Sequence, residues 1–315
     1  MNRHNLKISV LILLLPLIGL SQSASLSLQI HYITTWTFSQ SDSLSLSEPS
    51  SLSVSPDGSL FIADTDNNRI IKLNVNGRFV KQMGGFGWEK EQFNSPVAVS
   101  AENGLDVFVA DYYNNRIERY DKDLHYLASF SSGESWPDDL AFGFPLDVGI
   151  SSQGELFCLD GENQRVLKLD VLGNPQISFG DYDSGEGWIS QPGHLTVSRY
   201  ERIFVTDEDK AEIIAFDLHG NFLFTFGRGI FQKPAGMTEY GTDLFIIADS
   251  GRKQVMILYK YLKLINEISG SSENGFLFKE PVDVAVWKDR LYVLDRKRDA
   301  VDVFRLIFLK PAGVW

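Results

Sequence analysis

Apolar and polar residues alternate with a period of two in short runs along most of the chain, and Gly, Pro, Asn and Asp separate the runs. In one example Leu52 and Val54 precede the turn Pro56-Asp57-Gly58, and a second apolar run starts at Leu60. This pattern predicts β-strands joined by tight turns. Runs rich in Ala, Leu, Glu and Lys, which favour helix, are scarce, so the prediction is an all-β fold.

The strand pattern recurs as an internal repeat. Six prolines, 47, 49, 47, 42 and 47 residues apart, precede equivalent alternating runs: Pro49, Pro96, Pro145, Pro192, Pro234 and Pro281. A self-similar period of this size indicates a repeat architecture.

Each repeat contains four predicted strands. The first follows the proline, and the second ends at an aspartate 15 residues after the proline in five repeats and 14 after it in the last. A third strand and a fourth strand ending near a glycine complete the unit, as in Ile70 to Leu73 and the run before Gly84. Four short antiparallel strands make one propeller blade, so the sequence predicts a six-bladed β-propeller.

The sixth repeat lacks its own fourth strand, and the N-terminal strand is predicted to supply it. The segment from Tyr32 to Phe38 has no repeat before it, and Trp36 lies 13 residues before Pro49, as Met83 does before Pro96. This pairing would remove two exposed sheet edges. A rival arrangement places Val314 and Trp315 there, but Pro311 argues against a strand at that point.

Three segments carry a family resemblance. Residues 64–70, 111–117 and 160–166 resemble the signature of NHL repeats, with an Asp followed by Asn-Asn-Arg or Asn-Gln-Arg, and the resemblance weakens in the last three repeats. It implies a six-bladed propeller over roughly residues 30–308. The family includes scaffolds, RNA binders and peptide-amidating lyases, so the fold alone does not define the function.

The N-terminus is predicted to be a secretory signal peptide over residues 1–24, followed by a single propeller domain over 25–315. Arg3 and Lys7 precede an apolar run from Ile8 to Leu20, and small polar residues follow. The alternative is a retained membrane anchor, although the run is short and contains Pro16. The expected location is therefore secreted or periplasmic, with no transmembrane segment after cleavage.

The net charge limits the classes of ligand that the chain can bind, and the cysteine content indicates a structural role for its one thiol. Without the leader, 27 basic and 41 acidic residues give a formal charge of −14, which disfavours binding to nucleic acid. The single cysteine, Cys158, lies in an apolar run and is predicted to be a buried structural residue.

Candidate sites follow from the positions where blades differ, because the recurring Asp, Asn and Arg are expected to hold turns together. The residue two after each proline is predicted to ring one mouth of the central channel. This ring consists of Ser51, Ala98, Asp147, His194, Gly236 and Asp283. Asp147, His194 and Asp283 could bind Zn²⁺ or Ca²⁺, or act as a base with an orienting acid, and Glu239 could join them from deeper in the channel. Alternatively, these groups only hydrate the channel mouth.

Two further features are predicted on the same face. The turns between second and third strands in blades four to six carry cations that could bind an anionic ligand or could be solvated surface. They are Lys210, Arg252, Lys253, Arg296, Lys297 and Arg298. Trp88, Trp136 and Trp188 could form an aromatic platform or could cover blade edges.

The leading functional hypothesis is an exported binding module for a protein, peptide or glycan, possessing no certain cofactor. The alternative is a metal-dependent lyase or hydrolase at the channel, of the peptidyl-amidoglycolate lyase or lactonase type. The resemblance to that lyase type would imply several channel histidines and disulfides, whereas this ring contains only His194 and the chain only Cys158.

Overall fold

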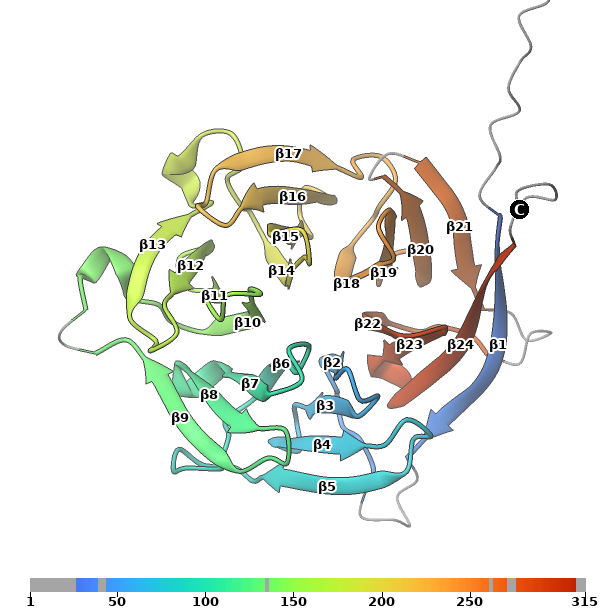
Figure 1. Cartoon of the computed structure of the whole chain (residues 1–315), viewed down its shortest axis with the longest axis horizontal. Helices are drawn as coiled ribbons and strands as arrows, with labels where there is room; N and C mark the ends of the chain where they lie inside the picture. Colours follow the sequence, from blue (N-terminus) through green and yellow to red (C-terminus); the bar gives the residue numbers. More distant parts are fainter. Residues whose placement is uncertain (1–26, 39–43, 134–135, 261–262, 271–275, 310–315) are drawn as a thin grey trace, which may run out of the picture.

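The protein is a ring of six four-stranded antiparallel sheets around a central channel (Figure 1). The computed structural model describes residues 27–38, 44–133, 136–260, 263–270 and 276–309. In five blades the strands follow one another outward in chain order, whereas the sixth has the order β22, β23, β24, β1. The predicted six-bladed propeller is therefore confirmed.

In each of the first three blades, the first strand begins at or close to the predicted proline. They are β2 (Ser51–Val54), β3 (Leu60–Asp64), β4 (Arg69–Leu73) and β5 (Phe79–Gly84) in blade 1, β6 (Pro96–Ser100), β7 (Asp106–Asp111), β8 (Arg116–Asp121) and β9 (Tyr126–Ser131) in blade 2, and β10 (Pro145–Ile150), β11 (Leu156–Asp160), β12 (Arg165–Leu169) and β13 (Pro175–Phe179) in blade 3.

The last three blades repeat the arrangement. They contain β14 (Pro192–Val197), β15 (Arg202–Asp207), β16 (Glu212–Asp217) and β17 (Phe222–Phe226) in blade 4, β18 (Pro234–Tyr240), β19 (Leu244–Asp249), β20 (Gln254–Tyr259) and β21 (Lys263–Ser269) in blade 5, and β22 (Pro281–Trp287), β23 (Arg290–Asp295), β24 (Ala300–Leu309) and β1 (Ser27–Thr37) in blade 6. Short 3-10 turns lie in the connections at Tyr112–Asn114, Asp138–Leu140, Tyr182–Ser184 and Arg296–Arg298.

The second strand of each blade is almost wholly buried because neighbouring blades cover both of its faces. All five residues of β3 and all six of β7 are buried. The apolar layer between blades 1 and 2, for example, joins Phe61 and Ile70 of one blade to Val99 and Val109 of the next. This packing explains why these strands are continuous apolar runs in the sequence.

The two faces of the ring are built from different connections. On one face lie the turns between second and third strands and the connections that lead to the six prolines; we call it the proline face. On the other lie the turns that join first to second and third to fourth strands; we call it the hairpin face. This division follows from the antiparallel order of the strands in every blade.

The recurring aspartate holds each turn of the proline face to the connection entering its blade. Asp64 accepts hydrogen bonds from Ser47 N (2.7 Å), Asn67 Nδ2 (2.9 Å) and Arg69 Nε (2.6 Å). Asp207 in blade 4 lacks the Asn and Arg and instead accepts backbone N–H groups, including that of Ser190 (2.7 Å). The structural role predicted for these residues is confirmed.

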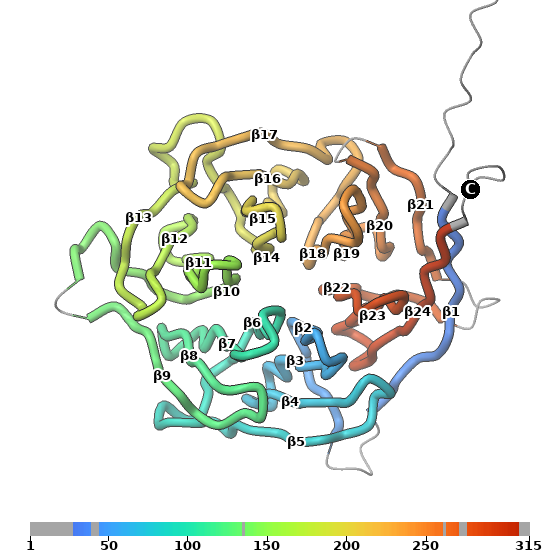
Figure 2. The backbone as a smooth tube through the Cα atoms, in the orientation of Figure 1, coloured from blue at the N-terminus to red at the C-terminus, as the bar shows by residue number. Residues whose placement is uncertain are grey.

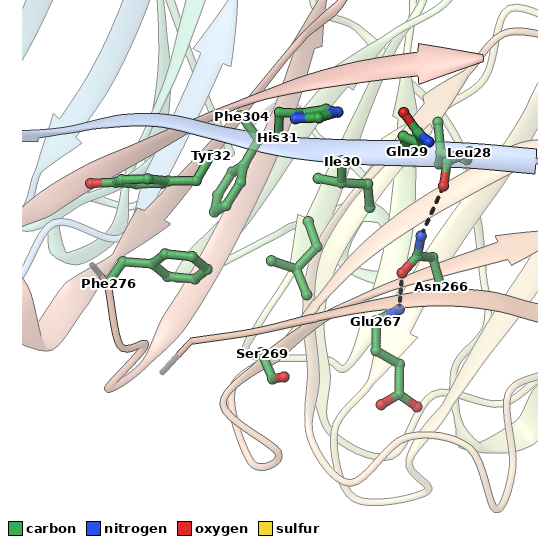
Figure 3. A pocket seen from close by; sticks show the side chains of 11 residues that line it. Leu28, Gln29, Ile30, His31, Tyr32, Asn266, Glu267, Ser269, Phe276 and Phe304 are labelled. Carbon is green, nitrogen blue, oxygen red and sulfur yellow. Dashed lines mark hydrogen bonds between the residues drawn. The ribbon is translucent and has the colours of Figure 1, made fainter. Parts of the chain in front are cut away.

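The N-terminal strand closes the ring, as predicted, and is longer than expected. β1 pairs with β24 from Ser27 opposite Leu309 to Thr37 opposite Ala300, and Figure 2 shows the N-terminal tube running beside the C-terminal one. Figure 3 shows Ile30 and Tyr32 on the side facing β21 and His31 on the other side. These residues border a cavity of ≈ 790 Å³ between β1 and β21, in which Tyr32 stacks on Phe276 with 5.0 Å between ring centroids.

The closure generates a matched prediction for two adjacent residues of β1. Tyr32→Ala should lower the free energy of unfolding by roughly 2–4 kcal/mol because it removes a ring packed on Phe276 and Phe304. His31→Ala, on the exposed side of the same strand, should change it by less than about 0.5 kcal/mol. Urea unfolding measures both, and equal effects would contradict the closing role of β1.

A second stability prediction concerns the residue before each third strand. It is left-handed in all six blades, and Ala211 occupies this position in blade 4 with φ 50°. Ala211→Gly should stabilise the fold by about 0.5–1 kcal/mol because the Cβ strain disappears. Asn115→Ala, at the same position in blade 2, should destabilise it by about 0.5–1.5 kcal/mol because Asn115 Oδ1 accepts the Phe144 N–H at 2.7 Å. Urea unfolding measures both, and a loss of stability in Ala211→Gly would contradict backbone strain at this position.

Candidate functional site

The predicted channel-mouth ring lies on the first strands of the six blades. Five of its members, Ser51, Ala98, Asp147, His194 and Gly236, line a cavity of ≈ 310 Å³ on the proline face. Asp283 lines a narrow space of ≈ 30 Å³ deeper in the channel, which Asp147 and His194 also border. The spacing from the proline therefore located the residues around the channel correctly.

His194 and Asp147 form an ion pair between blades 4 and 3. His194 Nδ1 lies 2.7 Å from Asp147 Oδ2, and His194 Nε2 lies 3.0 Å from Thr196 Oγ1. The Thr196 hydroxyl donates to the Met237 carbonyl at 2.8 Å, so its oxygen is left to accept from Nε2. Both ring nitrogens therefore act as donors, which is the pattern of a protonated imidazole.

Electrostatics agree with that protonation state. Burial lowers the pKa of His194, but the attraction and hydrogen bond of Asp147, together with the charges of Asp283 and Glu102, outweigh it and raise the pKa to about 9. The imidazole is thus a cation at neutral pH, with neither nitrogen free to accept a proton from a substrate.

The two channel aspartates join neighbouring inner strands. Asp147 accepts the N–H groups of Val148 (2.7 Å) and Leu195 (2.8 Å), and Leu195 belongs to the next blade. The inner strand is the edge of its sheet, so its channel-side N–H groups have no strand partner. The carboxylate supplies that partner across the blade junction.

Asp283 repeats this arrangement at the junction of blades 6 and 1. It accepts the N–H groups of Val284 and Leu52, each at 2.8 Å. Its close approach to blade 5 requires Gly236, because a Cβ at that position would overlap the Asp283 carboxylate. Burial raises the pKa of Asp283 to about 6, although His194 and the two N–H donors oppose the shift.

The expected metal site is not supported by this geometry. No three His, Cys, Asp or Glu side chains in the described parts of the chain are grouped so that they could hold a metal ion. Asp147 is engaged by His194 and two N–H groups, and Asp283 by two N–H groups of its own. The sequence did not reveal that backbone N–H groups of the following blade bind these two carboxylates.

The opposite mouth contains two carboxylates. Glu239 borders a cavity of ≈ 500 Å³ on the hairpin face rather than the proline-face cavity. Burial raises the pKa of Glu239, and Arg199 opposes the shift. Glu102, which the sequence analysis missed, borders the same cavity and also the narrow channel space. Comparing the turns between first and second strands would have revealed it, because blades 1 and 3 have Pro56 and Ser152 at its position.

The predicted basic residues lie on the proline face, and most are paired. Lys210 Nζ lies 3.6 Å from the centre of the Trp188 ring and 3.8 Å from Asp207. Further ion pairs join Arg252 to Asp249, Arg296 to Glu280, Lys297 to Glu48, and Arg298 to Asp302. Lys253 is exposed. Most of these cations are neutralised by neighbouring carboxylates, so the turns do not form a cationic patch. This favours the alternative that they are solvated surface rather than a site for an anionic ligand.

The three tryptophans divide between the two predicted roles. Trp136 packs on Phe142 and partly covers the apolar layer between blades 2 and 3. Trp188 is half-buried between Lys210 and Tyr182. Trp88 is 71% exposed and remains available to a ligand.

Sequence relatives share the repeat. The model of the NHL repeat matches residues 46–73. NHL repeat-containing protein 3 of Homo sapiens is 36% identical over 145 residues, which cover 44% of this chain and 39% of that protein. Protein brain tumor of Drosophila melanogaster is 28% identical over 151 residues, or 46% of this chain and 14% of that protein. The chain is an NHL-repeat β-propeller.

The matched segments span less than half the length of these NHL-repeat relatives, so their whole-protein activities do not transfer directly. Among solved structures, an inactive histidine-to-alanine variant of virginiamycin B lyase from Staphylococcus aureus with quinupristin is similar, with a TM-score of 0.62. It is 13% identical and covers 90% of this chain and 100% of the lyase chain, a likeness that establishes the fold. Within the residues described, no helix has the length and apolar character needed to span a membrane.

The ion pair between His194 and Asp147 in the channel of the NHL propeller predicts how the stability of the fold depends on pH. The folded pKa of His194, about 9, exceeds its ordinary value of 6.5, so its stabilisation is complete below pH 6.5 and disappears as the pH rises through 9. The stability difference between the parent and His194→Gln should shrink by roughly 2–3 kcal/mol from pH 6.5 to 9.5. His125→Gln, which alters an exposed surface pair with Asp121, is the control and should give no such trend. A pH-independent difference for His194→Gln, measured by urea unfolding, would mean that the imidazole is neutral.

Proposed function

We propose that this NHL propeller is an exported, non-catalytic module that binds a protein or peptide on its proline face. The observation that carries the proposal is a set of exposed aromatic side chains in the loops of that face. Phe86, Trp88, Tyr113 and Tyr182 are 67%, 71%, 57% and 81% exposed. Trp and Tyr are enriched among the residues that contribute most to protein interfaces.

The channel mouth between these loops suits a ligand with both donors and acceptors. Three ion pairs border its cavity: Asp147 with His194, Glu208 with Lys233 at 3.2 Å, and Glu280 with Arg296 at 3.3 Å. The pairs Glu208–Lys233 and Glu280–Arg296 each offer a donor and an acceptor to a peptide backbone, and the charges of all three pairs cancel. We therefore propose a peptide without a strong net charge in place of the anionic ligand expected from the sequence.

The enzymatic alternative has weaker support. An imidazole oriented by a carboxylate resembles a general acid–base arrangement, but Nδ1 and Nε2 of His194 are both engaged by Asp147 and Thr196. The structural likeness to virginiamycin B lyase rests on 13% identity and concerns the fold. This likeness assigns no catalytic role to any residue of this chain.

Export rests on the N-terminal sequence pattern. β1 begins at Ser27, so cleavage after residue 24 would leave the closing strand intact. This compatibility supports the proposal that the propeller acts outside the cytoplasm, in the periplasm or the medium.

Peptide selection tests the proposed ligand class. A library of random peptides displayed on phage is selected on the immobilised propeller, and the affinities of the selected peptides are measured by fluorescence anisotropy. The triple substitution Trp88→Ser, Tyr113→Ser and Tyr182→Ser should weaken binding at least thirtyfold, because one anchoring aromatic commonly contributes about 2 kcal/mol or more. The substitutions lie on exposed side chains and should leave unfolding nearly unchanged.

A matched hairpin-face variant provides the control. Leu105→Ser and Leu172→Ser remove two exposed apolar side chains from the opposite face and should not affect the peptides. Peptides that bind the aromatic triple variant as tightly as the parent would contradict the proposal. Cleavage of a selected peptide by the parent but not by His194→Gln, detected by mass spectrometry, would indicate the enzymatic alternative.

A further inference from the structure

The hairpin face has a continuous trench that the proposed function does not use. The cavity of ≈ 500 Å³ at the channel mouth and a groove of ≈ 510 Å³ between blades 2 and 3 share Asn103, Ile150, Ser151 and Ser152 as lining residues. All six blades contribute to the mouth, whereas blades 2 and 3 alone form the groove. A single extended ligand can therefore occupy both parts.

The groove is bordered by apolar side chains that the fold leaves uncovered. Leu105 and Val171, which line the groove, are 74% and 53% exposed, and Leu172, next to Val171 in the same turn, is 76% exposed. Val171 and Leu172 belong to the turn between β12 and β13, and Gly173 lets this turn lie against Phe130 because a Cβ there would overlap the ring. Phe130 lines the groove with Leu105 and Val171. The one cation of this groove wall, Arg119, is bound to Asp106 at 2.9 Å and 3.1 Å.

The channel mouth is acidic on the side that meets the groove. Glu102 immediately precedes the shared Asn103, its side chain is exposed, and it forms no hydrogen bond or ion pair with the residues described. Of the two cations that line the mouth, Arg199 attracts Glu239 and opposes the rise of its pKa, and Lys288 Nζ lies 4.0 Å from the centre of the Trp287 ring. Glu102 is thus an exposed carboxylate beside an apolar groove; His194 attracts it from within the channel, but no described residue forms a direct ion pair with it.

We infer that the hairpin face carries a second binding site, for an extended peptide with a basic side chain two residues before an apolar one. The basic group pairs with Glu102 at the mouth, and the apolar side chain lies in the groove between blades 2 and 3. Side chains two residues apart point the same way in an extended chain, so both can face the trench. The charge complementarity selects a cationic peptide, in contrast to the proline face, where the cavity charges are paired.

The pKa of Glu102 predicts how binding at this site depends on pH. Although the side chain of Glu102 keeps contact with solvent, partial desolvation at the channel mouth and the charges of Asp147, Asp283 and Glu239 raise its pKa to about 7, and protonated His194 opposes the shift. A bound cation favours the ionised carboxylate. Binding should therefore strengthen as the pH rises from 6 to 8, while the His194 imidazole, with its pKa of about 9, remains largely protonated.

Two synthetic peptides test the inference on the full propeller by isothermal titration calorimetry. One is acetylated, amidated Lys-Ser-Leu-Val-Leu, and in the other norleucine replaces the lysine. The parent should bind the lysine peptide about tenfold more tightly at pH 8, with less preference at pH 6, because a charged hydrogen bond stabilises by about 1.5–3 kcal/mol before losses to solvent screening. Glu102→Gln should bind both peptides equally at either pH.

Two control variants separate the parts of the site. Leu105→Ser with Val171→Ser should weaken both peptides by similar factors, and Glu208→Gln on the proline face should leave both affinities unchanged. Equal affinity of the parent for the two peptides, affinity no tighter than millimolar for either, or an equal effect of Glu208→Gln and Glu102→Gln would overturn the inference. These outcomes leave the proline-face proposal untouched, since they concern the opposite face.

Discussion

The pairing of β1 with β24 is the interaction on which the rest of the structure depends. Each blade buries its apolar faces against its neighbours, so blade 6 must be a complete sheet to cover both blade 5 and blade 1. β1 completes it from the other end of the chain, and Trp36 packs on Tyr292 with 5.6 Å between ring centroids. The channel and the cavities at its two mouths exist only in the closed ring.

Within the closed ring, polar side chains join the inner strands across blade junctions. Asp147 and Asp283 reach N–H groups of the following blade, and Ser51 Oγ accepts the Val99 N–H at 3.3 Å in the same way. These contacts hold carboxylates in a buried channel, where the protonated His194 is their main counter-charge. The channel is therefore a structural element with a preformed opening at each end.

The sequence was sufficient for the fold because the repeat spacing, the strand alternation and the unpaired N-terminal strand are all local patterns. It also located the channel ring, since a fixed offset from the proline specifies a position on the inner strand. It could not assign the roles of the ring, because the partners of Asp147 and Asp283 are backbone groups of another blade.

Long-range pairing also changed the interpretation of the surface charges. Lys297 pairs with Glu48 and Lys233 with Glu208, residues that no local pattern associates. Glu102 was not predicted because it lies in the turn between β6 and β7, whereas the candidate ring was defined by positions on the inner strands. Its location at the channel depends on the closure of the ring.

Native-state hydrogen exchange tests the central claim, that the inner strands are joined into one preformed channel. The Leu52 and Leu195 amides, bonded to the Asp283 and Asp147 carboxylates, should exchange only through global unfolding, with the same free energy as the Val293 amide at the centre of β23. Exchange of Leu52 and Leu195 through a local opening several kcal/mol below global unfolding would contradict it.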